Sequence, residues 1–150
     1  MISMAWRKEG LYILARTPVR RVRSYLDAPW EGDCIELCIQ TDGRRPSKAD
    51  SASLRLIIVP SSDTDRCSIW TESPSGGTIA ETVVARSRRD DRGLIIECMI
   101  PAAALSSQGL GAAHRLGMNY SVVVRGTPVE EFFCHREYEK AWTRPDLWGM

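Results

Sequence analysis

The sequence predicts an all-β protein: an antiparallel two-sheet β-sandwich of the jelly-roll type with one short helical turn. Three observations predict this fold class. Apolar and polar residues alternate with a period of two in short runs, clusters of Gly, Pro, Ser and Asp separate these runs, and a single segment has helical character. The 150 residues, 43% hydrophobic and 26% charged, have the composition of one globular domain. We therefore expect residues 1–150 to form a single domain.

The first half of the chain contains four predicted strands, each followed by turn residues. Leu11–Ala15 is the first of them. Asp33–Gln40 alternates most clearly, because its two isoleucines and its leucine fall on one face and Glu36 falls on the other. Leu54–Val59 ends at a proline, and Cys67–Thr71 is followed by a loop that contains proline and two glycines.

The second half predicts four more strands and the helical turn. Ile79–Arg86 and Leu94–Ile100 flank a charged turn and are expected to form a hairpin. Pro101–Leu105 opens with proline and continues with alanines, which suits one helical turn. Leu116–Val124 is the longest alternating run, and Phe132–Cys134 is a short one. The largely buried side chains predicted from this alternation are Ile35, Leu37, Ile39, Leu56, Ile96, Ile100, Met118 and Val122.

Charge and composition argue against several classes of partner. A formal net charge of +1 lacks the basic surplus of a general nucleic-acid-binding protein. No apolar run approaches the roughly 20 residues of a membrane-spanning helix, so no membrane contact is expected. The first residues do not have the pattern of a signal peptide, which taken alone predicts a cytoplasmic chain.

No arrangement of residues in the sequence indicates catalysis. His135 follows Cys134, but neighbours on a strand point to opposite faces and cannot form a nucleophile–base pair. Glu130–Glu131 is interpreted as a pair of solvated charges. The five cysteines lack the short paired spacing of a zinc site and are interpreted as small hydrophobic residues. We therefore expect no catalytic residue, no metal site and no cofactor.

The tryptophans are the most informative side chains. The chain has five tryptophans and only two phenylalanines, and Trp30, Trp142 and Trp148 lie in predicted loops outside the alternating core pattern. An indole offers a large flat apolar face and an N–H donor, which suits stacking on the C–H face of a sugar ring. The alternative interpretation is that these indoles cover the open ends of the sandwich.

Five segments carry motifs in a characteristic order. Ala5–Ile13 contains Trp-x-x-x-Gly-Leu-Tyr, and Ala28–Ile39 contains Trp-x-x-Asp-x-apolar-Glu. Ile95–Leu105 contains apolar-Glu-x-x-Ile-Pro-x-x-x-Leu, Leu116–Asn119 contains Gly-x-Asn, and Pro145–Gly149 is Pro-x-x-Trp-Gly. Together, over almost the whole chain, these segments resemble the family 9 carbohydrate-binding modules and the DOMON-like β-sandwiches.

This resemblance implies a non-catalytic β-sandwich that holds a sugar, often the end of a glucan or xylan chain, between two tryptophans. Trp30 would be one wall, and Glu36, six residues further on, would accept hydrogen bonds from sugar hydroxyls. Arg55 would be a donor on the same sheet face. The second wall would be Trp148 or Trp142. The predicted ligand site therefore consists of Trp30, Glu36, Asn119, Trp142 and Trp148 from the resemblance, and of Arg55 from its outward position on the next predicted strand. Asn119 could instead serve the fold.

The chain also departs from the family pattern. It begins almost at the Trp-x-x-x-Gly-Leu-Tyr segment, so we expect the usual opening strand to be missing. The sheet edge left open would be covered by the chain's own termini, by a second copy in a homodimer, or by another polypeptide. Family members are commonly secreted and attached to a glycoside hydrolase, which this module could accompany. They often bind calcium, for which the sequence offers no clear motif.

A related sandwich without sugar binding is the alternative function. It could be a protein-interaction module or a DOMON-like haem-binding domain. Haem would need an axial ligand such as His114, His135 or Met118, and Met118 falls on the apolar face of its predicted strand.

Overall fold

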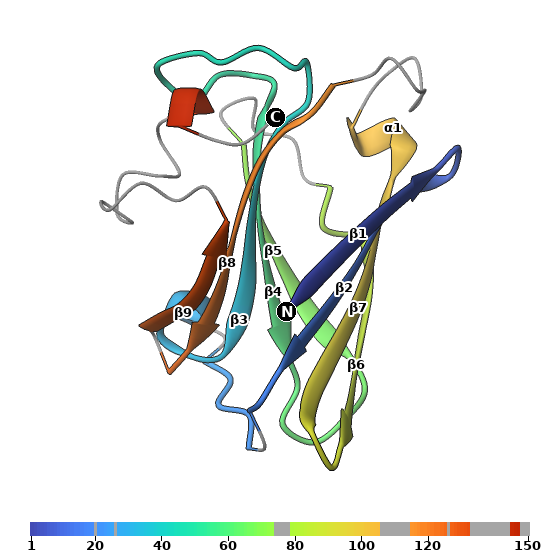
Figure 1. The fold of residues 1–150 in the computed structure, drawn as a ribbon, viewed down its shortest axis with the longest axis vertical. Coiled ribbons are helices and arrows are strands. Elements are labelled where there is room, and N and C mark those ends of the chain that lie inside the picture. The colour runs from blue at the N-terminus through green and yellow to red at the C-terminus, as the bar shows by residue number, and fades with distance from the viewer. Residues whose placement is uncertain are drawn as a thin grey trace.

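Two antiparallel β-sheets pack face to face in the computed structural model of the chain (Figure 1). The structure describes residues 1–19, 21–25, 27–73, 79–105, 115–125, 127–132 and 145–147. Within these residues the strand order is β1-β2-β7-β6 in the four-stranded sheet and β5-β4-β3-β8-β9 in the five-stranded sheet. The strands are β1 (Ile2–Arg7), β2 (Gly10–Thr17), β3 (Cys34–Gln40), β4 (Ser53–Pro60), β5 (Cys67–Glu72), β6 (Val84–Asp90), β7 (Gly93–Pro101), β8 (Gly117–Val124) and β9 (Thr127–Phe132).

Within the described residues, three short helical segments join or flank the strands. The α-helix α1 (Ala102–Leu105) directly follows β7 and confirms the helical turn predicted there. The 3-10 helix η1 (Pro29–Glu31) precedes β3, and η2 (Pro145–Leu147) lies near the end of the chain. No helix in the described part of the chain is long and apolar enough to cross a membrane.

The predicted two-sheet sandwich is confirmed, with differences at three strands. β1 was not predicted. β6 begins at Val84 rather than Ile79, because the amide N–H groups of Thr82 and Val83 bond to the carbonyl oxygen of Ile79 and close a turn. The last predicted strand is β9, which begins earlier, at Thr127, and Cys134 lies outside the described residues.

The core lies between the sheets and agrees with the predicted alternation. Seven of the eight predicted core residues are buried, and Met118 is partly buried and packs against the same cluster. Burying each large aliphatic side chain contributes about 1.5–3 kcal/mol, so this interface is the main source of stability. A further finding is that every residue of β3 is buried, on both faces of the strand.

Gly10 explains why the first motif contains a glycine. It is the first residue of β2 and lies opposite Pro101, the last residue of β7. A Cβ atom at Gly10 would lie 2.2 Å from the carbonyl oxygen of Ile100, which is far inside contact distance. The close approach of these two strands therefore requires glycine at this position.

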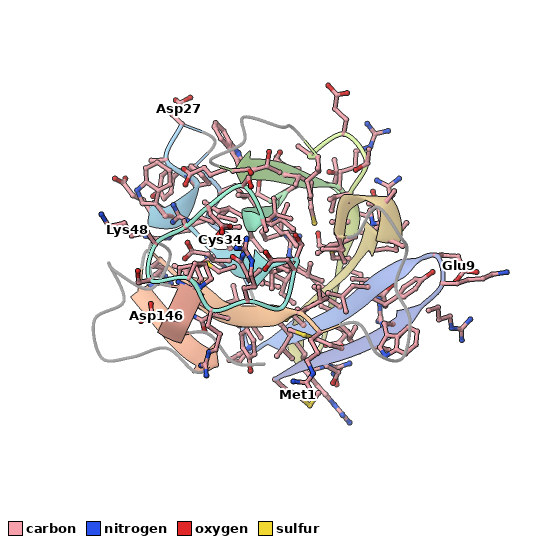
Figure 2. All side chains as sticks on the ribbon, turned by 90° about the horizontal axis from the view of Figure 1, so that it is seen from above. Met1, Glu9, Asp27, Cys34, Lys48 and Asp146 are labelled. Carbon is pink, nitrogen blue, oxygen red and sulfur yellow. The ribbon has the colours of Figure 1, made fainter. Side chains whose placement is uncertain are left out.

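The β1–β2 hairpin projects from one side of the molecule. In Figure 2 its tip is marked by Glu9, on the side away from Asp146 in the η2 segment. The label of Cys34, the first residue of β3, lies between them, near the centre of the sandwich. The hairpin and the five-stranded sheet thus occupy different sides of the fold.

Candidate functional site

The outer face of the five-stranded sheet, which points away from the other sheet, is partly covered. The segment before β3 folds over it: η1 lies against β4, and Pro29 of η1 is buried. Beneath this cover is a second, smaller hydrophobic cluster. Its members are Cys34, Ile57, Val59 and Val123.

Charged side chains cross this face from β3 to β5. The Arg55 guanidinium donates through Nε to Oε1 of Glu36, and its second nitrogen, Nη1, lies 2.9 Å from Oε2 of Glu72. The Glu36 side chain is 7% exposed and that of Arg55 is 17% exposed, whereas that of Glu72 is 48% exposed. The line therefore runs from a buried carboxylate to one at the surface.

The environment fixes the charge of Arg55. Burial alone would lower its pKa, but the carboxylates of Glu36 and Glu72 outweigh burial and raise the pKa above its ordinary value. Glu36 and Arg55 were both predicted as site residues, and the structure joins them directly. The pair forms a fixed polar centre on this sheet face, next to the small hydrophobic cluster.

Asn119 on β8 continues the same line. It is directly opposite Cys38 on β3, and Cys38 is directly opposite Arg55 on β4, so the three side chains share one face. Asn119 is 2% exposed. Among the residues that the structure describes, its amide oxygen Oδ1 has no hydrogen-bond partner. An unpaired buried acceptor of this kind costs about 1–3 kcal/mol.

Two exposed indoles belong to this side of the molecule. Trp30, one of the predicted walls, lies in η1 and is 46% exposed. Trp70 on β5 is 41% exposed and lies opposite Ile57, which is opposite Glu36, so Trp70 and Glu36 point to the same face. The other predicted walls, Trp142 and Trp148, lie outside the described residues.

Trp70 and Glu72 were not among the site residues predicted from the sequence. The signal was present, because β5 alternates Cys67 and Ile69 on the core side with Ser68, Trp70 and Glu72 on the other. What the sequence could not supply was the position of β5 next to β4, which brings Glu72 to Arg55.

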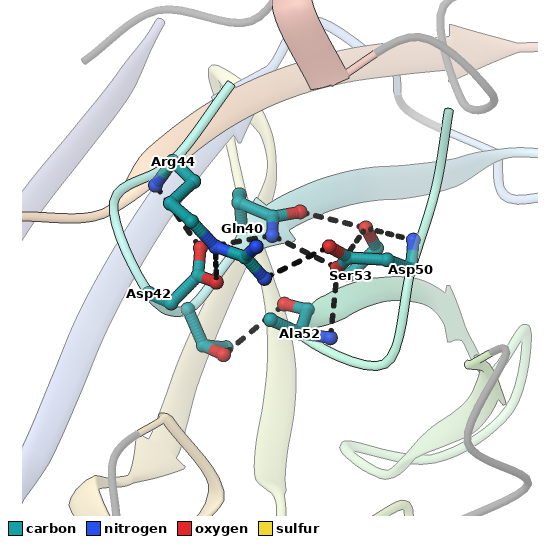
Figure 3. Close-up of polar contacts among 7 residues, drawn as sticks. Gln40, Asp42, Arg44, Asp50, Ala52 and Ser53 are labelled. Carbon is teal, nitrogen blue, oxygen red and sulfur yellow. Dashed lines mark hydrogen bonds and ion pairs between the residues drawn. The ribbon is translucent and has the colours of Figure 1, made fainter. Parts of the chain in front are cut away.

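A polar network holds the loop between β3 and β4 at one end of this face (Figure 3). The amide nitrogen of buried Gln40 donates to Oδ1 of Asp42 at 2.9 Å and to Oδ1 of Asp50 at 3.0 Å. Its amide oxygen accepts from the Ser53 hydroxyl at 2.6 Å. Arg44 binds both aspartates from the solvent side. The network fixes the loop without leaving the buried amide unpaired.

The network also sets the acidity of its two carboxyl groups. Burial alone would raise the pKa of Asp42, but hydrogen bonds from Gln40 and Arg44 outweigh burial and lower the pKa. The pKa of Asp50 is lowered chiefly by its hydrogen bond from Gln40, with a smaller contribution from Arg44. Both aspartates are therefore held in the ionised form.

Asp33 fixes the other end of the face. This buried carboxylate accepts the backbone N–H of Arg23 through Oδ2 at 2.7 Å and that of Arg125 through Oδ1 at 2.9 Å. It thereby joins the segment before β3 to the turn after β8. The aspartate of the Trp-x-x-Asp motif has a structural role in this chain.

Cysteine and metal chemistry are not indicated by the described residues. Burial first, and Glu36 second, raise the pKa of the Cys34 thiol to about 12, so it is protonated at neutral pH. No group of three or more His, Cys, Asp or Glu in the described part of the chain could hold a metal ion. Of the residues that a haem group would need, Met118 packs against the core, and His114 and His135 lie outside the described residues.

The architecture matches that of solved carbohydrate-binding modules. One is a family 9 module from Caldicellulosiruptor kristjanssonii in complex with cellotriose, with a TM-score of 0.77 and 18% sequence identity over 99% of this chain and 71% of that chain. Another is a family 9 module from the same organism in complex with glucose, with a TM-score of 0.74 and 17% identity over 99% of this chain and 72% of that one. This chain has the family 9 fold.

The family 9 likeness rests on structure rather than on close sequence similarity. No protein-family model matches the sequence, and a search of the curated proteins also gives no match. The resemblance seen in the five sequence motifs is confirmed at the level of the fold.

Proposed function

We propose that this chain is a non-catalytic carbohydrate-binding module that holds a glucan or xylan end on the outer face of its five-stranded sheet. Residues 1–150 would form one such domain. The observation that carries the proposal is the fixed charged line of Glu36, Arg55 and Glu72, next to the exposed indole of Trp70. Ionised groups bind hydroxyls strongly, and an indole stacks on the apolar face of a sugar ring.

Three further features support this site. Trp30 is exposed on the same side, where it offers a second stacking surface. Asn119, also a predicted site residue, lies on the same sheet face and has a buried acceptor without a partner among the described residues. The solved family 9 modules with the same fold were obtained with cellotriose and with glucose. Trp142 and Trp148 remain proposed walls in the same site.

Titration of the purified protein with cellotriose, followed by calorimetry and by tryptophan fluorescence, tests the proposal. We expect a dissociation constant on the order of micromolar to millimolar, because the site is small and binding must offset the loss of ligand freedom.

Trp30→Ala and Trp70→Ala should each stay folded and weaken binding by roughly 2–10-fold, corresponding to about 0.5–1.5 kcal/mol per stacked indole.

Trp6→Ala is the matched control. Trp6 is 53% exposed but belongs to β1 of the other sheet, so its loss should leave the affinity for cellotriose unchanged. Equal loss of affinity in Trp6→Ala, or no binding of cellotriose and xylotriose at millimolar concentration, would contradict the proposed site. Unfolding of Trp30→Ala would instead support the interpretation that this indole only covers the sandwich.

A further inference from the structure

Strand β1 forms one edge of the four-stranded sheet in the described part of the chain. Among the described residues it pairs only with β2. Proteins usually protect edge strands with charges, prolines or bulges, because the unpaired backbone groups otherwise attract another strand. β1 has no proline, its register with β2 runs without a bulge, and its single charge is Arg7 at its last position.

The hydrogen-bond register identifies the backbone groups at this edge. Met1 and Arg16 exchange both of their backbone hydrogen bonds, at 3.0 and 2.8 Å. In an antiparallel ladder such bonded pairs alternate with pairs that do not bond. The odd-numbered residues of β1 therefore bond to β2. The N–H and C=O groups of Ile2, Met4 and Trp6 point out of the sheet.

The inner face of this strand is also uncovered over part of its length. Met4 and Trp6 are exposed, although their neighbours on β2, Ile13 and Leu11, are buried on the same face. Ile2, at the start of the strand, is partly buried and packs against the core, so the uncovered part of the inner face lies at Met4 and Trp6.

The outer face of the same hairpin is apolar too. Tyr12 and Leu14 are exposed there and line a groove of about 550 Å³ together with Ser3 and Ala5 of β1. A partner packed on one face of the sheet would leave the other face uncovered. An added strand extends both faces at once, because its side chains alternate between them.

We propose that two copies of this chain associate by antiparallel pairing of β1 with β1, about a twofold axis at Met4. Met4 then lies opposite Met4 of the second copy, and Ile2 lies opposite Trp6 of the second copy. This register forms six backbone hydrogen bonds and pairs every outward N–H and C=O group of Ile2, Met4 and Trp6. A register centred on Ala5 would place Ile2 opposite Lys8 of the second copy, which lies outside β1. The outward N–H and C=O groups of Ile2 would then have no strand residue to pair with.

The same register is favourable for the side chains. On the inner face it places the apolar side chains of Ile2, Met4 and Trp6 beside one another across the axis. On the outer face Ser3 lies opposite Ala5 of the second copy, and both are small. The contact is self-complementary, as a twofold interface must be. It uses the four-stranded sheet and is independent of the sugar site on the other sheet.

Sedimentation velocity over a range of concentrations, with two variants of Met4, tests the pairing. Met4→Pro removes an N–H that points away from β2, so the β1–β2 ladder survives while the intermolecular one loses two central bonds. We expect the wild-type chain to form dimers, Met4→Ala to weaken the association only through its lost side-chain contacts, and Met4→Pro to weaken it roughly tenfold or more beyond Met4→Ala. Circular dichroism and cellotriose titration verify that each variant is folded.

Cysteine cross-linking tests the register in the otherwise unchanged protein. Met4→Cys should form an intermolecular disulfide under mild oxidation, because the two Cα atoms would lie about 5.5 Å apart. Trp6→Cys should not, since the two copies of this residue would be about 13 Å apart. The wild-type chain controls for its own cysteines. A wild-type protein that stays monomeric up to about 1 mM, a dimer unaffected by Met4→Pro, or equal cross-linking of both variants would overturn the proposal.

Discussion

Arg55 pairs with the carboxylates of Glu36 and Glu72. Replacing Arg55 should show how much an unpaired buried charge at Glu36 lowers the stability of the fold. In Arg55→Met, Glu36 is left as a buried charge beside apolar neighbours. We expect the free energy of unfolding in urea to fall by about 3 kcal/mol, at the lower end of the range for breaking a buried ion pair, because Glu72 is half exposed.

The double variant Glu36→Leu, Arg55→Met is the informative comparison. It removes both charges, so much of the lost stability should return. If cellotriose binding does not return with it, the pair serves the ligand as well as the fold. A double variant no more stable than Arg55→Met alone would show that the buried charge is not the cause.

The thiols predict a loss of stability at high pH. Burial raises the pKa of Cys98 to about 12 and that of Cys67 to about 11, as it does for Cys34. An unfolded thiol has a pKa of about 8.5. Between these values the unfolded chain loses protons that the folded chain keeps, so the stability these groups contribute is present below about pH 8.5 and is lost as pH rises.

Thermal unfolding at several pH values between about 8 and 11 measures this effect. The melting temperature should fall over this range, and it should fall less steeply in Cys34→Ala than in the wild-type chain. Parallel curves for the two proteins would argue against a contribution from Cys34.

At the scale of the element, the loop between β3 and β4 should respond to acid. Hydrogen bonds lower the pKa values of Asp42 and Asp50, so the stabilisation they give is present above the unfolded pKa of about 3.9 and is lost as pH falls below it. Asp50→Asn should make the melting temperature less sensitive to pH between about 5 and 3. Asp63→Asn, in an exposed turn, is the control and should leave that sensitivity unchanged.

The individual strands show how much of the fold could be predicted from the sequence. Alternation found β3, β4 and β8 because one face of each strand is packed against the core. The pattern Ile2, Met4, Trp6 alternates equally well, so β1 carried a usable signal, although its core side is exposed at Met4 and Trp6. A register of hydrogen bonds, by contrast, depends on the partner strand and cannot be read from one strand alone.

At the scale of the whole molecule, the candidate site combines neighbours that are distant in sequence. Glu36 and Arg55 could be proposed from motif and alternation, because both lie on strands with a clear outer face. The burial of Glu36 could not, since it depends on how the rest of the chain packs around β3. Trp70 likewise became a candidate only through the order of strands in the sheet.

The two sheets offer different surfaces. The five-stranded sheet carries fixed charges and two exposed indoles on its outer side, whereas the four-stranded sheet carries an apolar groove and an open edge. A molecule that paired through β1 would therefore keep both of its proposed sugar sites. Such a pair would bind a polysaccharide with two sites, which raises the effective affinity when both can be occupied at once.

The carboxylate of Asp33 has a consequence for the order of events in folding. It bonds to the N–H of Arg125, 92 positions away, so forming this contact closes a long loop of chain. Closing so long a loop early would be costly, and each doubling of its length adds about 0.6 kcal/mol.

Asp33→Asn should lower the free energy of unfolding by about 1.5–3 kcal/mol, as expected for the loss of bonds to a charged group. Stopped-flow kinetics should show this loss almost wholly as faster unfolding, with the refolding rate little changed. A comparable slowing of refolding would place the contact in the folding nucleus instead.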